Sequence, residues 1–147
     1  MNLAEKLNTK SMELASANDE VENEIFAYFA EIFRSGKFET LLEKELTKRR
    51  ESLVDKKFTM ILEFWDYTSG CSDTHFSIWA YQWKNPLATS WESRDYKGVH
   101  LHDIQRSCGS RLLELAKSEL LKMGFKVSVE DDESWLNYYK KKITIRW

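Results

Sequence analysis

Few residues in this chain of 147 residues could carry chemistry, and the most suggestive group is His100, His102 and Asp103. Side chains two residues apart on a strand point to the same face, so the two imidazoles could bind one metal ion. A metal site needs at least a third ligand, and the spacing of the remaining cysteines and histidines brings none to the pair. We therefore expect no metal and no cofactor, and we expect Asp103 to cap the helix that follows.

Nucleophilic catalysis would require a cysteine or serine held against a histidine base. Cys71 or Cys108 could pair with His75, and Ser110 could pair with His102, but no motif in the sequence defines either geometry. Cys108 falls on the apolar side of a predicted helix, where cysteine usually serves as a small hydrophobic residue. The sequence also lacks a glycine-rich phosphate loop and a nucleophile elbow. These observations indicate a protein that is not an enzyme.

Aromatic side chains in two consecutive apolar stretches, residues 58–67 and 75–83, form the strongest candidate for a binding surface. Alternating apolar positions predict two strands joined as a long antiparallel hairpin. The aromatic residues would then share one face of the hairpin. That face could lie at the centre of a protein interface, stack nucleic-acid bases, or be covered by the N-terminal helices. The residues of this predicted face are Trp65, Tyr67, Trp79, Tyr81 and Trp83.

A second candidate surface is acidic, because residues 19–45 contain eight carboxylates and three basic side chains. Glu20, Glu24 and Glu31 lie in its helical part and could imitate nucleic-acid phosphates toward a basic groove of a partner. The simpler interpretation is a solvated helix face. The formal net charge of −2 and the pI of 6.0 favour a protein partner over nucleic acid. Basic clusters at residues 48–50 and 140–142 keep nucleic-acid or nucleotide binding as the alternative.

Helices must position the acidic surface. Leu3, Leu7 and Leu14 share one side of a predicted helix over residues 2–16, and residues 16–19 (Ser-Ala-Asn-Asp) are expected to interrupt it. Apolar residues then recur at helical spacing from Val21 to Phe33, with Asn18 or Asp19 as the N-terminal cap and Gly36 as the end. A third helix is predicted over residues 38–53.

The remaining elements predict a sheet. After the aromatic hairpin, residues 87–102 are ambiguous between a strand and a loop, and a helix runs from Asp103 to Met123 and ends at Gly124. Residues 125–129 and 143–147 alternate and predict a second, short hairpin. We therefore predict one α+β domain over residues 1–147, with a helical part at 1–56 and a sheet with one helix at 57–147. The sheet should be antiparallel with four to five strands, and the single helix should lie between the two hairpins.

The cellular compartment is predicted from three features that the sequence lacks: a disulfide framework, a signal peptide and a membrane span. Two cysteines are too few for a disulfide framework, and the N-terminal residues lack the apolar core of a signal peptide. No stretch approaches the ~20 apolar residues that a membrane span requires. We expect a cytoplasmic protein that does not bind membranes.

The C-terminal quarter carries a family resemblance. Leu120-Leu121-Lys122-Met123-Gly124-Phe125-Lys126-Val127, followed by the closing Ile143-Thr144-Ile145-Arg146-Trp147, resembles small uncharacterised α+β proteins of bacteriophages and prophages of Gram-positive bacteria. The helix from Val21 to Gly36 fits the same resemblance loosely. The aromatic hairpin and residues 83–102 depart from it, so no functional residue carries over. The resemblance implies a phage-type accessory protein in the host cytoplasm.

The leading hypothesis is a non-enzymatic phage-type protein that acts by binding a host or phage protein. An inhibitor of a host defence system, of the anti-CRISPR kind, is one concrete version. The aromatic face could also mediate formation of a homo-oligomer. The alternatives are nucleic-acid or nucleotide binding through that face, a role as a virion structural protein, and a metal-dependent enzyme centred on His100 and His102.

Overall fold

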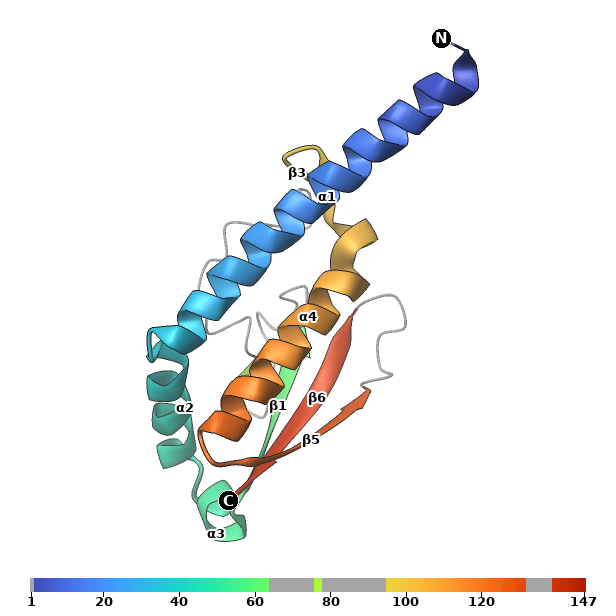
Figure 1. Cartoon of the computed structure of the whole chain (residues 1–147). Helices are drawn as coiled ribbons and strands as arrows, with labels where there is room; N and C mark the ends of the chain where they lie inside the picture. Colours follow the sequence, from blue (N-terminus) through green and yellow to red (C-terminus); the bar gives the residue numbers. More distant parts are fainter. Residues whose placement is uncertain (1, 64–75, 78–94, 132–138) are drawn as a thin grey trace.

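A computed structural model describes residues 2–63, 76–77, 95–131 and 139–147 of the chain (Figure 1). Its longest element is helix α1, which runs without a break over Leu3–Arg34, 32 residues. Asn2 caps it, because the side-chain oxygen of Asn2 accepts a hydrogen bond from the backbone N–H of Glu5 at 2.9 Å. No helix that the structure describes is both long enough and apolar enough to cross a bilayer.

The predicted interruption at residues 16–19 is wrong, and neither Asn18 nor Asp19 caps a helix. The segment contains neither glycine nor proline, so each residue costs the helix only a fraction of a kcal/mol, well under ~1 kcal/mol. The apolar face that begins at Val21 packs in the core and stabilises the second half of the helix. The first half extends this helix, because adding residues to an existing helix is easier than nucleating a new one.

The end of α1 agrees with the prediction. Gly36 has φ of 81°, a left-handed conformation that glycine adopts without strain, and helix α2 begins directly after it at Lys37–Lys48. The predicted third helix over 38–53 is instead two helices, because Arg49 leaves the helical region and α3 covers only Arg50–Asp55. The guanidinium of Arg49 lies 5.4 Å from the ring centroid of Phe58, and this contact joins the end of α2 to the sheet.

Within the described residues, four strands form a sheet in the order β2-β1-β6-β5. Strand β1 pairs antiparallel with β6 along its full length, and β6 pairs antiparallel with β5. The second pairing confirms the predicted C-terminal hairpin, with Val127 opposite Ile145. A separate pair, β3 with β4, forms a short hairpin before helix α4. The bounds are β1 Lys57–Glu63, β2 Phe76–Ser77, β3 Asp95–Tyr96, β4 Val99–His100, β5 Lys126–Asp131 and β6 Lys140–Arg146.

Two predictions about the sheet are wrong. The stretches 58–67 and 75–83 do not form an antiparallel hairpin in the described residues, since β2 pairs with β1 in parallel and Phe76 lies opposite Met60. The antiparallel part of the sheet has three strands in the described ranges, where four to five were expected. The antiparallel neighbour of β1 is instead the C-terminal strand β6, which places Ile143 and Ile145 opposite Met60 and Phe58.

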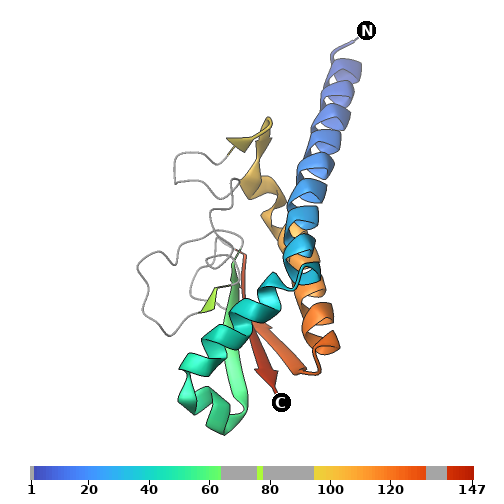
Figure 2. The ribbon, with the colours of Figure 1, turned by 90° about the vertical axis from the view of Figure 1, so that its left-hand side faces the viewer.

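Helix α4, Leu101–Lys122, lies beside α1 on the same face of the sheet (Figures 1 and 2). His100 occupies its N-cap position, so the prediction that Asp103 caps this helix is wrong; Asp103 lies in the first turn, where the helix dipole favours a carboxylate. Apolar residues of α1, α2, α4 and the sheet form one core, which confirms the coarse α+β fold. Its fully buried members include Phe29, Phe38, Met60, Leu62, Leu112, Leu120, Ile143 and Ile145.

Candidate functional site

The predicted aromatic face lies outside the described residues, and so do the candidate nucleophile Cys71 and its candidate base His75. The structure describes the acidic surface of α1 completely. The five aromatic residues concerned are Trp65, Tyr67, Trp79, Tyr81 and Trp83.

Residues 11–33 of α1 contain six carboxylates and neither Lys nor Arg. An α-helix turns about 100° per residue, so four of these carboxylates lie within about 40° of one another on one side of α1. We call this set, which lies about 60–100° around the helix from the buried Val21, the acidic row. It consists of Glu13, Glu20, Glu24 and Glu31, and it includes all three acidic residues predicted to contact a partner.

Glu24 is bound within the molecule by the β3–β4 hairpin. The hydroxyl of Tyr96 donates to its Oε1 at 2.5 Å, and Nζ of Lys97 donates to its Oε2 at 3.0 Å. These bonds, the one from Tyr96 first, lower the pKa of Glu24, and the same carboxylate raises the pKa of Tyr96 and of Lys97. Glu24 therefore holds the hairpin against α1.

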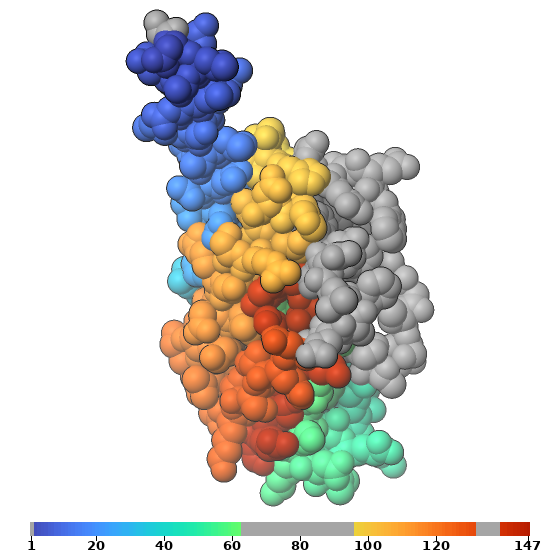
Figure 3. Space-filling model, turned by 90° about the vertical axis from the view of Figure 1, so that its right-hand side faces the viewer, coloured from blue at the N-terminus to red at the C-terminus, as the bar shows by residue number. Residues whose placement is uncertain are grey.

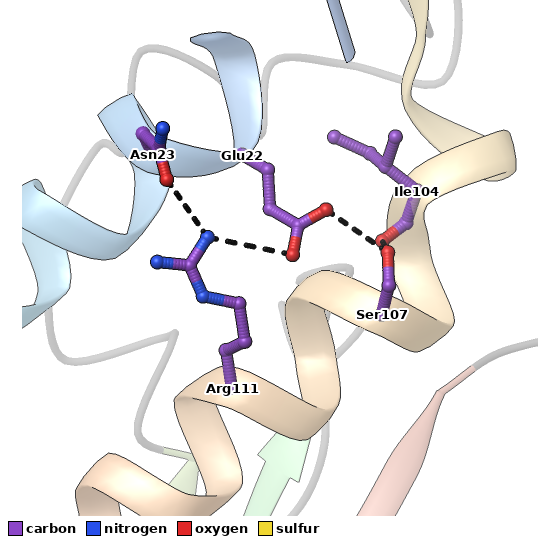
Figure 4. A network of polar contacts seen from close by, with 5 residues as sticks. All are labelled: Glu22, Asn23, Ile104, Ser107 and Arg111. Atoms are coloured by element: carbon purple, nitrogen blue, oxygen red, sulfur yellow. Dashed lines mark hydrogen bonds and ion pairs between the residues drawn. The ribbon is translucent and has the colours of Figure 1, made fainter. Parts of the chain in front are cut away.

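Glu22 lies on the buried side of α1, about 180° around the helix from the acidic row. It binds residues of α4 (Figure 4). The hydroxyl of Ser107 donates to Oε2 of Glu22 at 3.0 Å, and Nη1 of Arg111 lies 3.5 Å from Oε1. The same Nη1 donates to Oδ1 of Asn23 at 2.9 Å, and the guanidinium of Arg111 lies 4.5 Å from the ring centroid of Phe26. This network fixes α1 beside α4.

Sequence reasoning missed the Glu22–Arg111 network. A usable signal was present, because Ser107 and Arg111 are four residues apart and therefore share one edge of α4. The sequence did not indicate which of the six carboxylates faces that edge, since this depends on how the two helices pack.

Besides Glu24, four of the six carboxylates between residues 11 and 33 are exposed to solvent. Within the described residues, their side chains make no hydrogen bond and no ion pair. Of the three predicted contact residues, Glu20 and Glu31 belong to this set, and Glu24 does not. The exposed set is Glu13, Asp19, Glu20 and Glu31.

The histidine pair does not lie on one strand. His100 ends β4 and His102 lies in the first turn of α4, with ring centroids 6.1 Å apart. Nε2 of Gln105 donates to Nδ1 of His102 at 2.9 Å, and Oε1 of the buried Gln105 accepts from the backbone N–H of Tyr139 at 3.1 Å. In the described ranges, no group of three or more His, Cys, Asp or Glu residues could hold a metal ion. The contacts of this region join α4 to the start of β6.

The described nucleophile candidates are poorly placed for catalysis. Cys108 is fully buried, and burial first, then the charge of Glu22, raises the pKa of its thiol to about 12. The thiol is therefore protonated at neutral pH. Ser110 hydrogen-bonds to Tyr139, and it lies eight residues after His102 on α4, about 12 Å along the helix axis, which is too far for a nucleophile–base pair.

No protein-family model, no curated protein and no solved structure matches this chain.

Proposed function

We propose that this chain is a non-enzymatic, phage-type accessory protein that binds a basic surface of a partner protein through the acidic row of α1. The observation that carries the proposal is the row itself: residues 11–33 lack any basic residue, and Glu20 and Glu31 face solvent without a counter-ion in the described residues. A partner with Lys or Arg at matching positions would supply the missing charge.

The energetics of the row support a role in recognition. Glu20 and Glu24 are like charges at positions i and i+4, an arrangement that costs a helix about 0.2–0.5 kcal/mol. The β3–β4 hairpin offsets this cost at Glu24 through Tyr96 and Lys97. Glu20 has no such partner within the described residues, so a basic partner protein would offset the cost there.

The density of charge favours a patch on a protein over a long nucleic-acid groove. Glu20 and Glu31 are about 16 Å apart along the helix, whereas duplex DNA carries one phosphate charge per ~1.7 Å. The row is thus too sparse to replace an extended duplex and suits a few basic side chains. An inhibitor that occupies the basic surface of a host defence nuclease, of the anti-CRISPR kind, is the concrete version of this proposal.

The test is a pull-down of the tagged full chain from bacterial lysate, with and without nuclease treatment, in wild-type and charge-reversed forms. Glu20→Lys should abolish capture of a defined protein that survives nuclease treatment. Asp19→Lys is the matched control, because it makes the same charge change at an exposed position about 100° around the helix. Capture that both variants retain, or capture of nucleic acid alone, would contradict the proposal.

A further inference from the structure

An apolar groove of about 380 Å³ lies between α2, α3 and the region where β5 begins and the chain ends. Leu53 and Trp147 line it and are large apolar side chains with 45% and 41% of their surface exposed. The ring of Phe125 also lines it and packs edge-on against Trp147, with centroids 5.8 Å apart. Glu39 and Glu43, one helical turn apart on α2, are its charged residues, and no Lys or Arg of the described chain lines it.

The N-terminal arm, residues 2–16, projects from the opposite end of the molecule (Figures 1 and 3). Every residue of this arm is exposed. Leu3, Leu7 and Leu14 lie within about 40° of one another around the helix, and they are 70%, 52% and 52% exposed. The same side of α1 is buried further along the helix, at Val21 and Ile25. The arm thus has the apolar side of a packing helix, and no described residue covers it.

The arm and the groove match in charge as well as in polarity. Lys6 and Lys10 are one turn apart on the arm and flank the leucines at about 40–80° around the helix. Glu39 and Glu43 have the same spacing on α2, at the border of the groove. The arm therefore carries an apolar line with a basic flank, and the groove at the other end of the molecule is apolar with an acidic border.

We propose that the arm of one copy of this chain docks into the groove of a second copy. Leu3 and Leu7 enter the groove, and Lys6 and Lys10 pair with the two glutamates of α2. The arm does not reach the groove of its own chain, because the continuous helix α1 holds the two at opposite ends of the molecule (Figure 1). The arm and the groove are different surfaces, so the contact between them is heterologous. Such a contact can assemble a reciprocal dimer, a closed ring or an open chain.

The first experiment is sedimentation of the full chain over a range of protein concentrations. The average mass should rise above the 17.5 kDa of one chain as the concentration increases. Leu7→Lys in the arm and Leu53→Lys in the groove should each leave a monomer. Met12→Lys is the matched control: Met12 is 66% exposed on the arm but points about 160° away from the leucines, so assembly should persist. Far-UV circular dichroism of each variant checks that it is folded.

A charge exchange tests the pairing directly. Lys6→Glu with Lys10→Glu, and Glu39→Lys with Glu43→Lys, should each abolish assembly, and an equimolar mixture of the two double variants should restore it. A chain that stays at 17.5 kDa at every concentration would overturn the proposal. So would an assembly that survives Leu53→Lys, because the arms would then be pairing with something other than the groove.

Discussion

At the scale of single residues, Gly109 shows how a locally unfavourable residue is explained by its neighbours. Glycine within a helix costs roughly 1 kcal/mol relative to alanine, so the sequence of α4 by itself disfavours it. In the structure the ring of Tyr139 lies directly on the backbone at this position, and a Cβ on residue 109 would be 2.7 Å from Cγ of Tyr139. The aromatic ring takes the place that a side chain would occupy.

We predict that Gly109→Ala destabilises the protein by about 1–3 kcal/mol, although alanine is the better helix former, because the new methyl group forces the Tyr139 ring to move. Urea unfolding measures the change. Ser118→Ala, at an exposed position of the same helix, should change the unfolding free energy by less than about 0.5 kcal/mol. A gain in stability for Gly109→Ala would mean that the ring does not pack there.

At the scale of elements, the β3–β4 hairpin is too short to be stable by itself. Its two-residue turn consists of Lys97 and Gly98, both with positive φ, the combination that a type I′ turn requires. Val99 is fully buried in the core, and Tyr96 and Lys97 bind Glu24 of α1. The hairpin therefore depends on a helix some seventy residues earlier in the chain.

We predict that Glu24→Gln lowers the thermal midpoint at pH 7 and that this difference disappears in acid. The pKa of Glu24 is lowered in the folded state, so its contribution to stability is present above the ordinary value of 4.5 and is lost as the pH falls through the folded pKa. Thermal unfolding from pH 7 to pH 2 measures the effect. Glu31→Gln removes an exposed carboxylate that has no partner among the described residues, so its midpoint should follow the wild type throughout.

At the scale of the whole molecule, the packed part of the chain, which we call the body, and the N-terminal arm have different roles. The core joins α1 from Val21 onward to α2, α4 and the sheet, whereas residues 2–16 contribute no buried side chain. The stability of the monomer therefore comes from the body, and the apolar side of the arm is available for the contact proposed with a second copy.

Deleting residues 2–14 should accordingly leave the unfolding free energy within about 0.5 kcal/mol of wild type, because only exposed residues are removed. The same deletion should leave the protein monomeric at every concentration. Urea unfolding at low protein concentration and sedimentation measure the two properties. A loss of several kcal/mol would show instead that the arm is packed within the monomer.

Features that depend on neighbouring residues could be predicted from the amino-acid pattern. The ends of helices at Gly36 and Gly124, the buried side of α1 from Val21 to Phe33 and the C-terminal hairpin were predictable, because helical periodicity, strand alternation and glycine conformation are local properties. The acidic character of α1 was likewise visible in composition.

The pairing of distant segments depends on how the whole chain packs. Strand β1 pairs with β6 because their facing residues, Phe58 with Ile145 and Met60 with Ile143, complete one core, and no local pattern encodes that choice. The same holds for the carboxylates: Glu22 and Glu24 bind other elements, whereas Glu20 stays exposed. Six similar side chains between residues 11 and 33 acquire different roles because packing places partners beside only some of them.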